Sequence, residues 1–530
     1  MRDRNPKLKS LLAVADHPAF FVGVLVLAVG FVNYDILNAT PLLACLEPDS
    51  WGYVTTNTLR TQGDQLFLSG IHLIFGDLRW GGPIQLNAML LSYVAVAFAV
   101  RRLFRSNAAG LAVAASLMLS AQLYAWYPKI MAEALFITLI GFHLTAVIYL
   151  LDAYSDRWAV AAGVTLAAMV LVRPNGVSFL LGIPVLVILL PKYWRRLLLL
   201  GIGPAVIAVV AQATLNYYQQ DFFGLTVFTG PQLVATYGEL ITADMPSQYP
   251  ELAAALEARL RPLYAKYPPP DERSFPFGYA AVAASVVTPA QYQYAWPEMT
   301  SYVAKLMPDA SSTARAQVID RIGTSLAISA IAHNPVGFLK DVGSSFADYW
   351  ATQSLYHSSG LNQIAAWCYD SSKVAITGND SGTFARVLDF TPYSQPETAR
   401  TITVLASAGP RLIERPWLWF QRLRLRYLVM AVTFVVSLVG LASLLVKRPP
   451  GKLLGLWAYL GINLQGGYLV LSLANASFSR YASPLDVVVM VTFMTFVIGL
   501  WNFVAVRMRR RWARARIGQD KPDALSTGGA

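Results

Sequence analysis

Apolar runs separated by short polar segments dominate the pattern of hydrophobic and polar positions along this chain. Ten of these runs have roughly the length, about 20 residues, that a helix needs to cross a lipid bilayer. They occupy residues 18–37, 84–100, 107–127, 130–151, 158–172, 176–190, 197–217, 427–446, 453–473 and 484–506. The pattern therefore predicts an all-α, multi-pass membrane protein with about ten transmembrane helices.

Lysine and arginine residues indicate how these helices are oriented. The net charge of the 530-residue chain is +12, and half of its 42 basic residues fall in short segments at alternate ends of the expected helices. Positive charges in such segments mark the cytoplasmic side of a membrane, where anionic headgroups attract them. We therefore expect both termini in the cytoplasm, and the charge gives no reason to expect a nucleic-acid partner.

The expected helices divide the chain into consecutive parts. We expect a seven-helix module at residues 1–217, with a long first outer loop at 38–83, and a large extracytoplasmic insertion at 218–426. Three more helices follow at 427–506, and the basic tail at 507–530 is expected to be disordered.

The insertion is expected to be mostly helical. Residues 250–267 and 311–333 have helical periodicity, whereas alternating strand patterns are scarce. No repeat of fixed period is present, and the two halves of the chain differ in their number of expected helices. This difference argues against a transporter built from inverted repeats.

Acidic residues in the first outer loop are the most informative polar feature. Glu47 and Asp49 lie shortly after the first apolar run, where acidic side chains are costly unless chemistry or a partner uses them. Asp49 is the first candidate for a catalytic base, and the alternatives are an exposed loop acid or a helix N-cap before Trp51. Asp64, later in the same loop, is either a solvated acid or part of the same site.

Other charged residues also fall on the expected outer face. Glu133 begins an apolar run, where it either complements the helix dipole or faces a cavity. Because few basic residues are expected on this face, those in its short loops are candidates for function: Arg60, Arg79, Lys129, Arg173 and Arg480.

In type and order, the outer motifs resemble those of the GT-C membrane glycosyltransferases, such as protein O-mannosyltransferases and aminoarabinose transferases. Pro-Asp-Ser at 48–50 and RTQGDQLFL at 60–68 are similar to the acidic motif and the R-x-P-G-Y-P-L-F-L segment of that family. Polar residues, including Asp64, stand where the family has proline and tyrosine. A proline also separates Glu47 from Asp49, whereas family members often have adjacent acids.

Four later segments follow the order of the family's motifs. MAEALF at 131–136 resembles the S/T-E-S/A-L-F start of a helix, and VRPNG at 172–176 resembles the helix-ending R-P-x-G. AHNPVGFL at 332–339 is similar to the N-P-x-x-F/Y-L helix of the large loop, and SRYASP at 479–484 is similar to R-Y-x-x-P before a late helix. The resemblance covers nearly the whole chain.

The resemblance implies a GT-C-like fold and an inverting transfer of a sugar from a polyprenyl-phosphate carrier to an acceptor hydroxyl. The acceptor would be an envelope glycan, a lipid or a protein, at the periplasmic face of a bacterial plasma membrane. A carboxylate would accept the hydroxyl proton; the candidates are Asp49, Glu47, Glu133 and Asp64. The donor phosphate would be bound by Arg60, Arg173, Arg480 and Tyr481, although each arginine is alternatively an interfacial side chain.

Aromatic residues near the outer interface are candidates to line a lipid or acceptor groove, or are simply interfacial anchors. Phe338, Phe346, Tyr349 and Trp350 follow Pro335 with amphipathic spacing, so we expect this face to lie flat on the membrane. The candidates for the groove are Tyr53, Trp126, Tyr127, Tyr349 and Trp350.

Metal and disulfide chemistry are only weakly indicated. The five histidines form no dense cluster in the sequence, so we expect no metal site, although Mg²⁺ or Mn²⁺ bound by the carboxylates remains open. Cys45 and Cys368 both fall on the expected outer face, either as a disulfide or as two unpaired thiols.

Two other classes of function remain open. A transporter or lipid flippase needs ionisable residues near the bilayer midplane, where His143 and Gln465 are the notable polar residues. A non-catalytic subunit of an envelope assembly would keep the acidic loop without activity.

Overall fold

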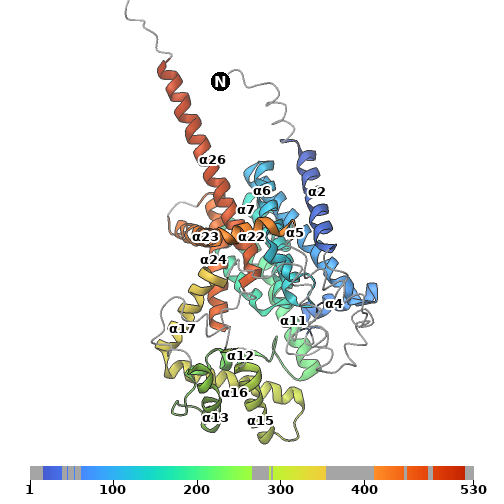
Figure 1. Ribbon diagram of the computed structural model, residues 1–530, viewed down its shortest axis with the longest axis vertical. Coiled ribbons are helices and arrows are strands. Elements are labelled where there is room, and N and C mark those ends of the chain that lie inside the picture. Colours follow the sequence, from blue (N-terminus) through green and yellow to red (C-terminus); the bar gives the residue numbers. More distant parts are fainter. Residues whose placement is uncertain are drawn as a thin grey trace, which may run out of the picture.

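The computed structural model describes residues 16–38, 45, 50, 53, 61–265, 286–287, 290–353, 411–446, 450–474 and 482–519, with side chains up to residue 511. Helices make up the secondary structure of this part of the chain, and it contains no β-strand. The expectation of an all-helical protein is confirmed for the described residues. Figure 1 shows a helical bundle with helices of the insertion gathered below it.

The amino-terminal half of the bundle contains most of its long helices. Its α-helices are α2 (Pro18–Leu37), α4 (Gln62–Phe75), α5 (Gly81–Phe104), α6 (Asn107–Met118), α7 (Ala132–Asp152), α8 (Asp156–Val172), α9 (Gly182–Leu189), α10 (Trp194–Leu197) and α11 (Gly203–Gln220). Short 3₁₀ or π segments connect them: η2 (Leu78–Trp80), η3 (Ala121–Ala125), η4 (Pro174–Leu181), η5 (Pro191–Tyr193) and η6 (Leu198–Ile202).

The remaining elements form the insertion and the carboxy-terminal helices. The insertion contains α12 (Thr229–Thr236), η7 (Gly238–Leu240), α13 (Pro250–Tyr264), η9 (Ala290–Ala295), α15 (Trp296–Leu306), α16 (Ser312–His333), α17 (Pro335–Asp348) and η10 (Tyr349–Gln353). The chain ends with α22 (Glu414–Arg422), α23 (Leu425–Ser443), α24 (Lys452–Ala474), η11 (Ser483–Leu485) and α26 (Asp486–Gln519). Helices α13 and α16 confirm the helical periodicity of the insertion.

Six segments of the described chain are long and apolar enough to cross a membrane. The other predicted runs also form helices, at α6, α8, η4–α9 and α24, but α6 and the segment Pro174–Leu189 are shorter. The protein is therefore a helical membrane protein by the length and composition of its helices, and the number of ten spans stays a prediction. The six segments are Pro18–Leu37, Leu78–Phe104, Ala132–Asp152, Pro191–Gln220, Leu425–Ser443 and Ser483–Arg511.

Helix α7 lies at the centre of the bundle and is the most buried of the six segments. It packs against α5, α8, α24 and α26. Small residues permit close helix approach elsewhere in the bundle: a Cβ atom at Gly440 of α23 or Gly461 of α24 would collide with the backbone of the other helix.

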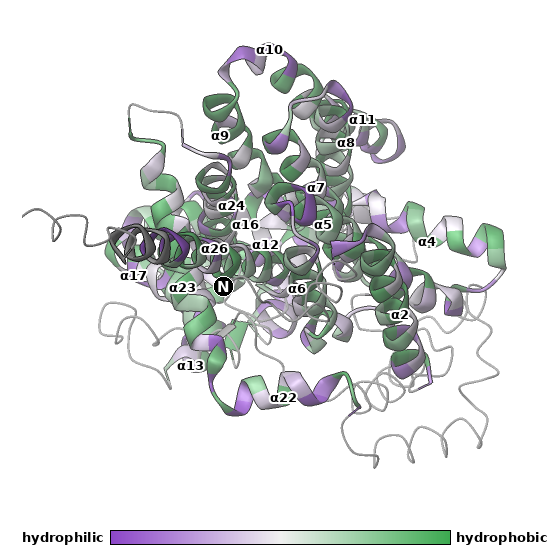
Figure 2. Cartoon of the chain, turned by 90° about the horizontal axis from the view of Figure 1, so that it is seen from above, coloured by the Kyte–Doolittle hydropathy of each residue, from purple (hydrophilic) through white to green (hydrophobic). Residues whose placement is uncertain are grey.

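The two ends of the bundle differ in composition and in neighbours. At one end lie the start of α2 and the arginine-rich part of α26, and we call this the basic end (Figure 1). At the other, the insertion end, α12, α13, α15 and α16 enclose a separate hydrophobic core that includes Leu252, Leu256 and Leu326. Viewed along its axis, the bundle is mainly hydrophobic, and α4 and α22 run across that axis (Figure 2).

The insertion packs against the bundle through aromatic side chains that contact α24. The ring of Tyr349 stacks on that of Tyr468, with 5.5 Å between centroids, and Trp350 contacts the same ring at 5.0 Å. The hydroxyl of Tyr237, on the insertion side, donates to the carbonyl of Leu473 at 2.8 Å. Tyr349 and Trp350 are thus buried inside the protein, and the expectation that they lie on the membrane surface is wrong, because the bundle supplies aromatic partners for them.

Candidate functional site

Helix α4 brings the first outer loop against the end of α8 at the insertion end. The hydroxyl of Thr61, the N-cap residue of α4, donates to the carbonyl of Val172 at 2.9 Å. Gly63 lies so close to α8 that an added Cβ would be 2.6 Å from the carbonyl carbon of Leu171. These contacts hold the first turn of α4 against α8 and direct Asp64 into the protein.

The rest of α4 is amphipathic and explains why the helix lies across the bundle axis. Leu66, Leu73 and Ile74 are largely exposed, at 65%, 86% and 73%. A helix with exposed apolar side chains beside a membrane-spanning bundle is typical of the interface between lipid and water. Gly76 ends the helix in the left-handed conformation, with φ of 69°.

Asp64 has the most unusual environment of the described acidic residues. Its side chain is fully buried, and neither carboxylate oxygen has a hydrogen-bond partner within the described chain. The pKa of Asp64 is raised from 3.8 to about 7: burial has the largest effect, the nearby carboxylate of Glu133 also raises it, and the guanidinium of Arg173 lowers it. At neutral pH this carboxyl group is therefore poised to accept or release a proton.

Glu133 and Arg173 form a buried ion pair next to Asp64. The Oε1 atom of Glu133 lies 2.9 Å from Nη1 of Arg173, and the two side chains are only 0% and 9% exposed. Glu133 is in the first turn of α7, and Arg173 directly follows α8, so each charge complements the dipole at its helix end. We call Asp64, Glu133 and Arg173 the acid–arginine cluster.

The charge balance of the acid–arginine cluster depends on Asp64. The guanidinium offsets one carboxylate, so the cluster is neutral when Asp64 is protonated and carries one negative charge when it is not. Two buried carboxylates close to one cation disfavour the second ionisation. Burial is the main reason why the pKa of Asp64 lies above the usual range of an aspartate, and the charge of Glu133 adds to it.

The first outer loop also contacts the chain just before α7. The backbone of Cys45 pairs with that segment, since its N–H donates to the carbonyl of Pro128 at 2.8 Å and its carbonyl accepts from Ile130 at 2.9 Å. The hydroxyl of Ser50 donates to the carbonyl of Ile130 at 2.9 Å. Cys45 and Ser50, which lie on either side of the Glu47–Asp49 segment, are therefore both hydrogen-bonded to Ile130, three residues before Glu133.

Cys45 is disulfide-bonded, which decides between the two alternatives for this thiol. Cys368 is the other cysteine of the sequence and lies outside the described residues.

A buried cation and a narrow crevice adjoin this region. Lys129 is only 9% exposed, and its ammonium group lies 4.7 Å from the centre of the Trp126 ring. Arg173 also lines a narrow crevice together with Ser178, Leu471 and Pro484. The crevice thus joins the R-P-x-G segment to the proline of the late R-Y-x-x-P segment.

Several residues singled out from the sequence lie outside the described residues, so the structure gives no account of them: Glu47, Asp49, Arg60, Arg480 and Tyr481. Tyr53 and Tyr127 belong to the hydrophobic core, and Trp126 is half-buried against it. Of the site residues proposed from the sequence, the structure brings together Asp64, Glu133 and Arg173.

Sequence reasoning did not anticipate two features of this region. The helix α4 falls inside the expected outer loop, although the apolar spacing of Leu68 and Ile71 is a signal for it. Lys129 was a candidate only as one of several outer basic residues, and its burial has no signature in the sequence. No three His, Cys, Asp or Glu side chains converge as a metal site within the described residues.

Comparisons of the chain with protein-family models, curated proteins and solved structures find no match. The site is therefore interpreted from its own chemistry and from the order of its motifs.

Proposed function

We propose that this protein is an inverting membrane glycosyltransferase of the GT-C type. In this proposal it moves a sugar from a polyprenyl-phosphate carrier to an acceptor hydroxyl of an envelope glycan, a lipid or a protein. The active site lies at the insertion end and faces the periplasm of a bacterial plasma membrane, with both termini in the cytoplasm.

One observation carries the proposal: the acid–arginine cluster. Three of the motifs, which are far apart in the sequence, contribute Asp64, Glu133 and Arg173 to one buried cluster. A transfer to a hydroxyl needs a base near neutral pH and a cation for the departing phosphate. Both kinds of group are present in the cluster.

The proposed reaction uses these groups in one displacement. A carboxylate takes the proton of the acceptor hydroxyl, and the hydroxyl oxygen forms a bond to the anomeric carbon of the sugar. The bond between that carbon and the phosphate oxygen breaks, its electron pair stays on the phosphate, and the polyprenyl phosphate leaves. Arg173, together with Arg60 and Arg480 from the motifs, would offset the charge that develops on the phosphate.

Two carboxyl groups compete for the role of base. Asp49 is favoured by its position in the acidic motif, whereas Asp64 is favoured by its raised pKa. Glu133 is already paired with Arg173, which favours a role in positioning the guanidinium. Glu47 remains a candidate to assist Asp49.

The transporter alternative gains no support from His143, one of the two deep polar residues that suggested it. The imidazole of His143 is satisfied by the hydroxyl of Tyr459 at 2.5 Å and by Thr165 and the carbonyl of Ala162 at 3.1 Å. A histidine whose two ring nitrogens both have protein partners is typical of a structural network.

The test is a donor assay on the purified protein. A panel of polyprenyl-phosphate sugars is first screened for donors that raise the melting temperature, because a bound ligand stabilises the folded state. Release of polyprenyl phosphate is then measured for wild type, Asp49→Asn, Asp64→Asn and Asp221→Asn. Asp221 is an exposed residue at the end of α11 in a left-handed conformation that asparagine tolerates, so this variant is the control.

We expect the variant that lacks the base to keep donor binding and lose turnover, while Asp221→Asn keeps both. If Asp64 is the base, the wild-type rate rises with pH through about 7. If Asp49 is the base, Asp64→Asn keeps turnover but alters the pH profile. A protein that neither binds nor cleaves any donor of the panel refutes the proposal.

A further inference from the structure

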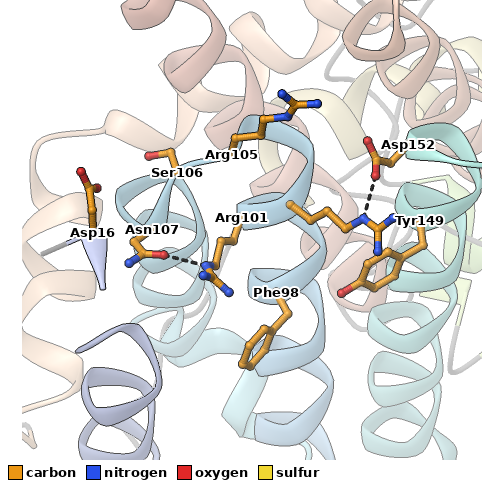
Figure 3. Close-up of a pocket in the computed structure, with 9 residues that line it drawn as sticks. Asp16, Phe98, Arg101, Arg105, Ser106, Asn107, Tyr149 and Asp152 are labelled. Carbon is orange, nitrogen blue, oxygen red and sulfur yellow. Dashed lines mark hydrogen bonds and ion pairs between the residues drawn. The ribbon is translucent and has the colours of Figure 1, made fainter. Parts of the chain in front are cut away.

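An open cleft of about 680 Å³ lies at the basic end of the bundle. Asp152, which lines it, is the last residue of α7, whereas Glu133 of the acid–arginine cluster lies in the first turn of the same helix. The walls of the cleft are the last turns of α5, the start of α6 and the last turn of α7, as Figure 3 shows. The side chains that line it are Asp16, Phe98, Arg101, Arg102, Arg105, Ser106, Asn107, Tyr149 and Asp152.

The cleft carries an excess of positive charge. Asp152 already accepts from Arg102 at 2.7 Å and from Lys452 at 2.9 Å, so its charge is offset. Arg101 donates to the side-chain carbonyl of Asn107 at 2.6 Å, a neutral partner. Within the described chain, Arg105 makes no ion pair. Asp16 also lines the cleft, but no ion pair joins it to Arg101 or Arg105 among the described residues, and the three arginines outnumber the two carboxylates of the lining.

The turn between α5 and α6 gathers these donors on one side. Arg105 has the left-handed conformation, with φ of 51°, and the N–H of Ser106 donates to the carbonyl of Arg101 at 3.1 Å. The chain thus reverses direction within two residues and begins α6 beside the guanidinium groups. Arginine forks match the oxygens of a phosphate, and the start of a helix favours an anion.

Aromatic side chains give the cleft an apolar component. Tyr149 and Phe98 line it, and the guanidinium of Arg102 lies 5.3 Å from the centre of the Tyr149 ring. The cleft sits at the ends of α5 and α7, two of the segments that are long and apolar enough to cross a membrane. The guanidinium groups therefore lie beside apolar side chains at the ends of membrane-spanning candidates, where a bilayer surface is expected. This combination suits a phosphate headgroup with attached acyl chains better than a free soluble anion.

From this geometry we propose that the cleft binds the phosphate-bearing headgroup of an anionic membrane phospholipid, held by Arg101 and Arg105. The site is separate from the proposed transferase reaction and does not depend on it.

The test titrates the purified full-length protein in a neutral detergent with phosphatidylglycerol, with phosphatidylcholine of the same acyl chains, or with inorganic phosphate. The melting temperature is followed for wild type and for the double variant Arg101→Gln/Arg105→Gln. The control, Arg195→Gln/Arg509→Gln, removes the same charge from two arginines outside the cleft.

Phosphatidylglycerol is expected to stabilise wild type and the control at similar concentrations. Phosphatidylcholine is expected to have no such effect. The double variant should need at least about ten times the phosphatidylglycerol concentration of wild type for the same rise in melting temperature. Equal affinity of the double variant and wild type would overturn the proposal. If inorganic phosphate stabilises wild type as well as the lipid does, the site is one for a soluble anion and the lipid assignment is wrong.

A second measurement needs no variant and applies even if the double variant fails to fold. Wild type is irradiated with a photoactivatable phosphatidylglycerol that carries its reactive group next to the phosphate, and the labelled peptides are mapped. Label is expected at residues 98–107 and 149–152. Label confined to other peptides would refute the cleft as the binding site.

Discussion

Replacing Asp64 by asparagine should make the protein more stable at neutral pH, although the substituted residue is in the proposed active site. The wild-type carboxyl group is fully buried without a hydrogen-bond partner in the described chain, and its pKa is raised to about 7. In the unfolded chain the pKa of the same group is close to 3.8. Between these two values the folded state holds a proton that the unfolded state has released.

The sign and size of the effect follow from this difference. Because the folded state binds the extra proton, the free energy of unfolding is highest at low pH and falls as the pH rises towards about 7. A difference of about three pKa units corresponds to about 4 kcal/mol in total, of which about 3 kcal/mol falls between pH 5 and pH 8. Asparagine does not titrate, so the variant should lose this dependence and gain stability chiefly above pH 6.

The assay is thermal unfolding in detergent at pH 5, 6, 7 and 8 for wild type, Asp64→Asn and the control Asp221→Asn. Wild type and the control should lose stability in parallel as the pH rises, and Asp64→Asn should lose less. The reasoning is refuted if Asp64→Asn shows the same pH dependence as wild type, since the buried carboxyl would then have an ordinary pKa.

Three further changes test the surroundings of Asp64. Glu133→Gln removes one of the two carboxyl groups near the buried Arg173 guanidinium and leaves Asp64 as the other, so we expect a loss of about 1–3 kcal/mol in unfolding free energy; an unchanged unfolding free energy would contradict a buried pair. Gly63→Ala forces the start of α4 away from α8 and should cost about 1–3 kcal/mol, whereas Gly70→Ala meets no atom within 4 Å and should be neutral or stabilising. Reduction of the disulfide at Cys45 should lower the melting temperature, by the equivalent of about 2–5 kcal/mol; an unchanged melting temperature would show that the bond does not constrain the fold.

The helices of the bundle could be predicted from the sequence because lipid imposes a simple rule on their length and polarity. The bounds of α2 agree with the predicted run at both ends. The run at 107–127 was expected to be one helix, but α6 ends at Met118 and a 3₁₀ turn follows. The hydroxyl of Tyr124 donates to the carbonyl of Met118 at 3.0 Å and satisfies the broken helix end, a contact that hydropathy does not encode.

The site was predictable in its residue types but not in its geometry. Glu133 and Arg173 could be singled out because charges at the ends of apolar runs are uncommon. Their mutual contact could not, since it depends on how α7 and α8 pack. The sequence leaves Asp64 as either a solvated loop acid or a site residue, because the polar residues on both sides of it do not indicate that a helix begins at Gln62. The prediction that Tyr349 and Trp350 lie on the membrane surface is wrong because an amphipathic pattern does not tell whether its apolar face contacts lipid or protein.

The sharp bend between α16 and α17, 104° at Asn334 and Pro335, has a mechanical consequence. On one side of the bend α16 belongs to the core of the insertion, and on the other α17 leads to the aromatic ring of Tyr349, which stacks on Tyr468 in the carboxy-terminal half of α24. The same half of α24 supplies Leu471 to the crevice lined by Arg173. A displacement of the helices of the insertion would therefore be transmitted, through the stacked rings, to the part of α24 that lines the crevice beside the Arg173 guanidinium.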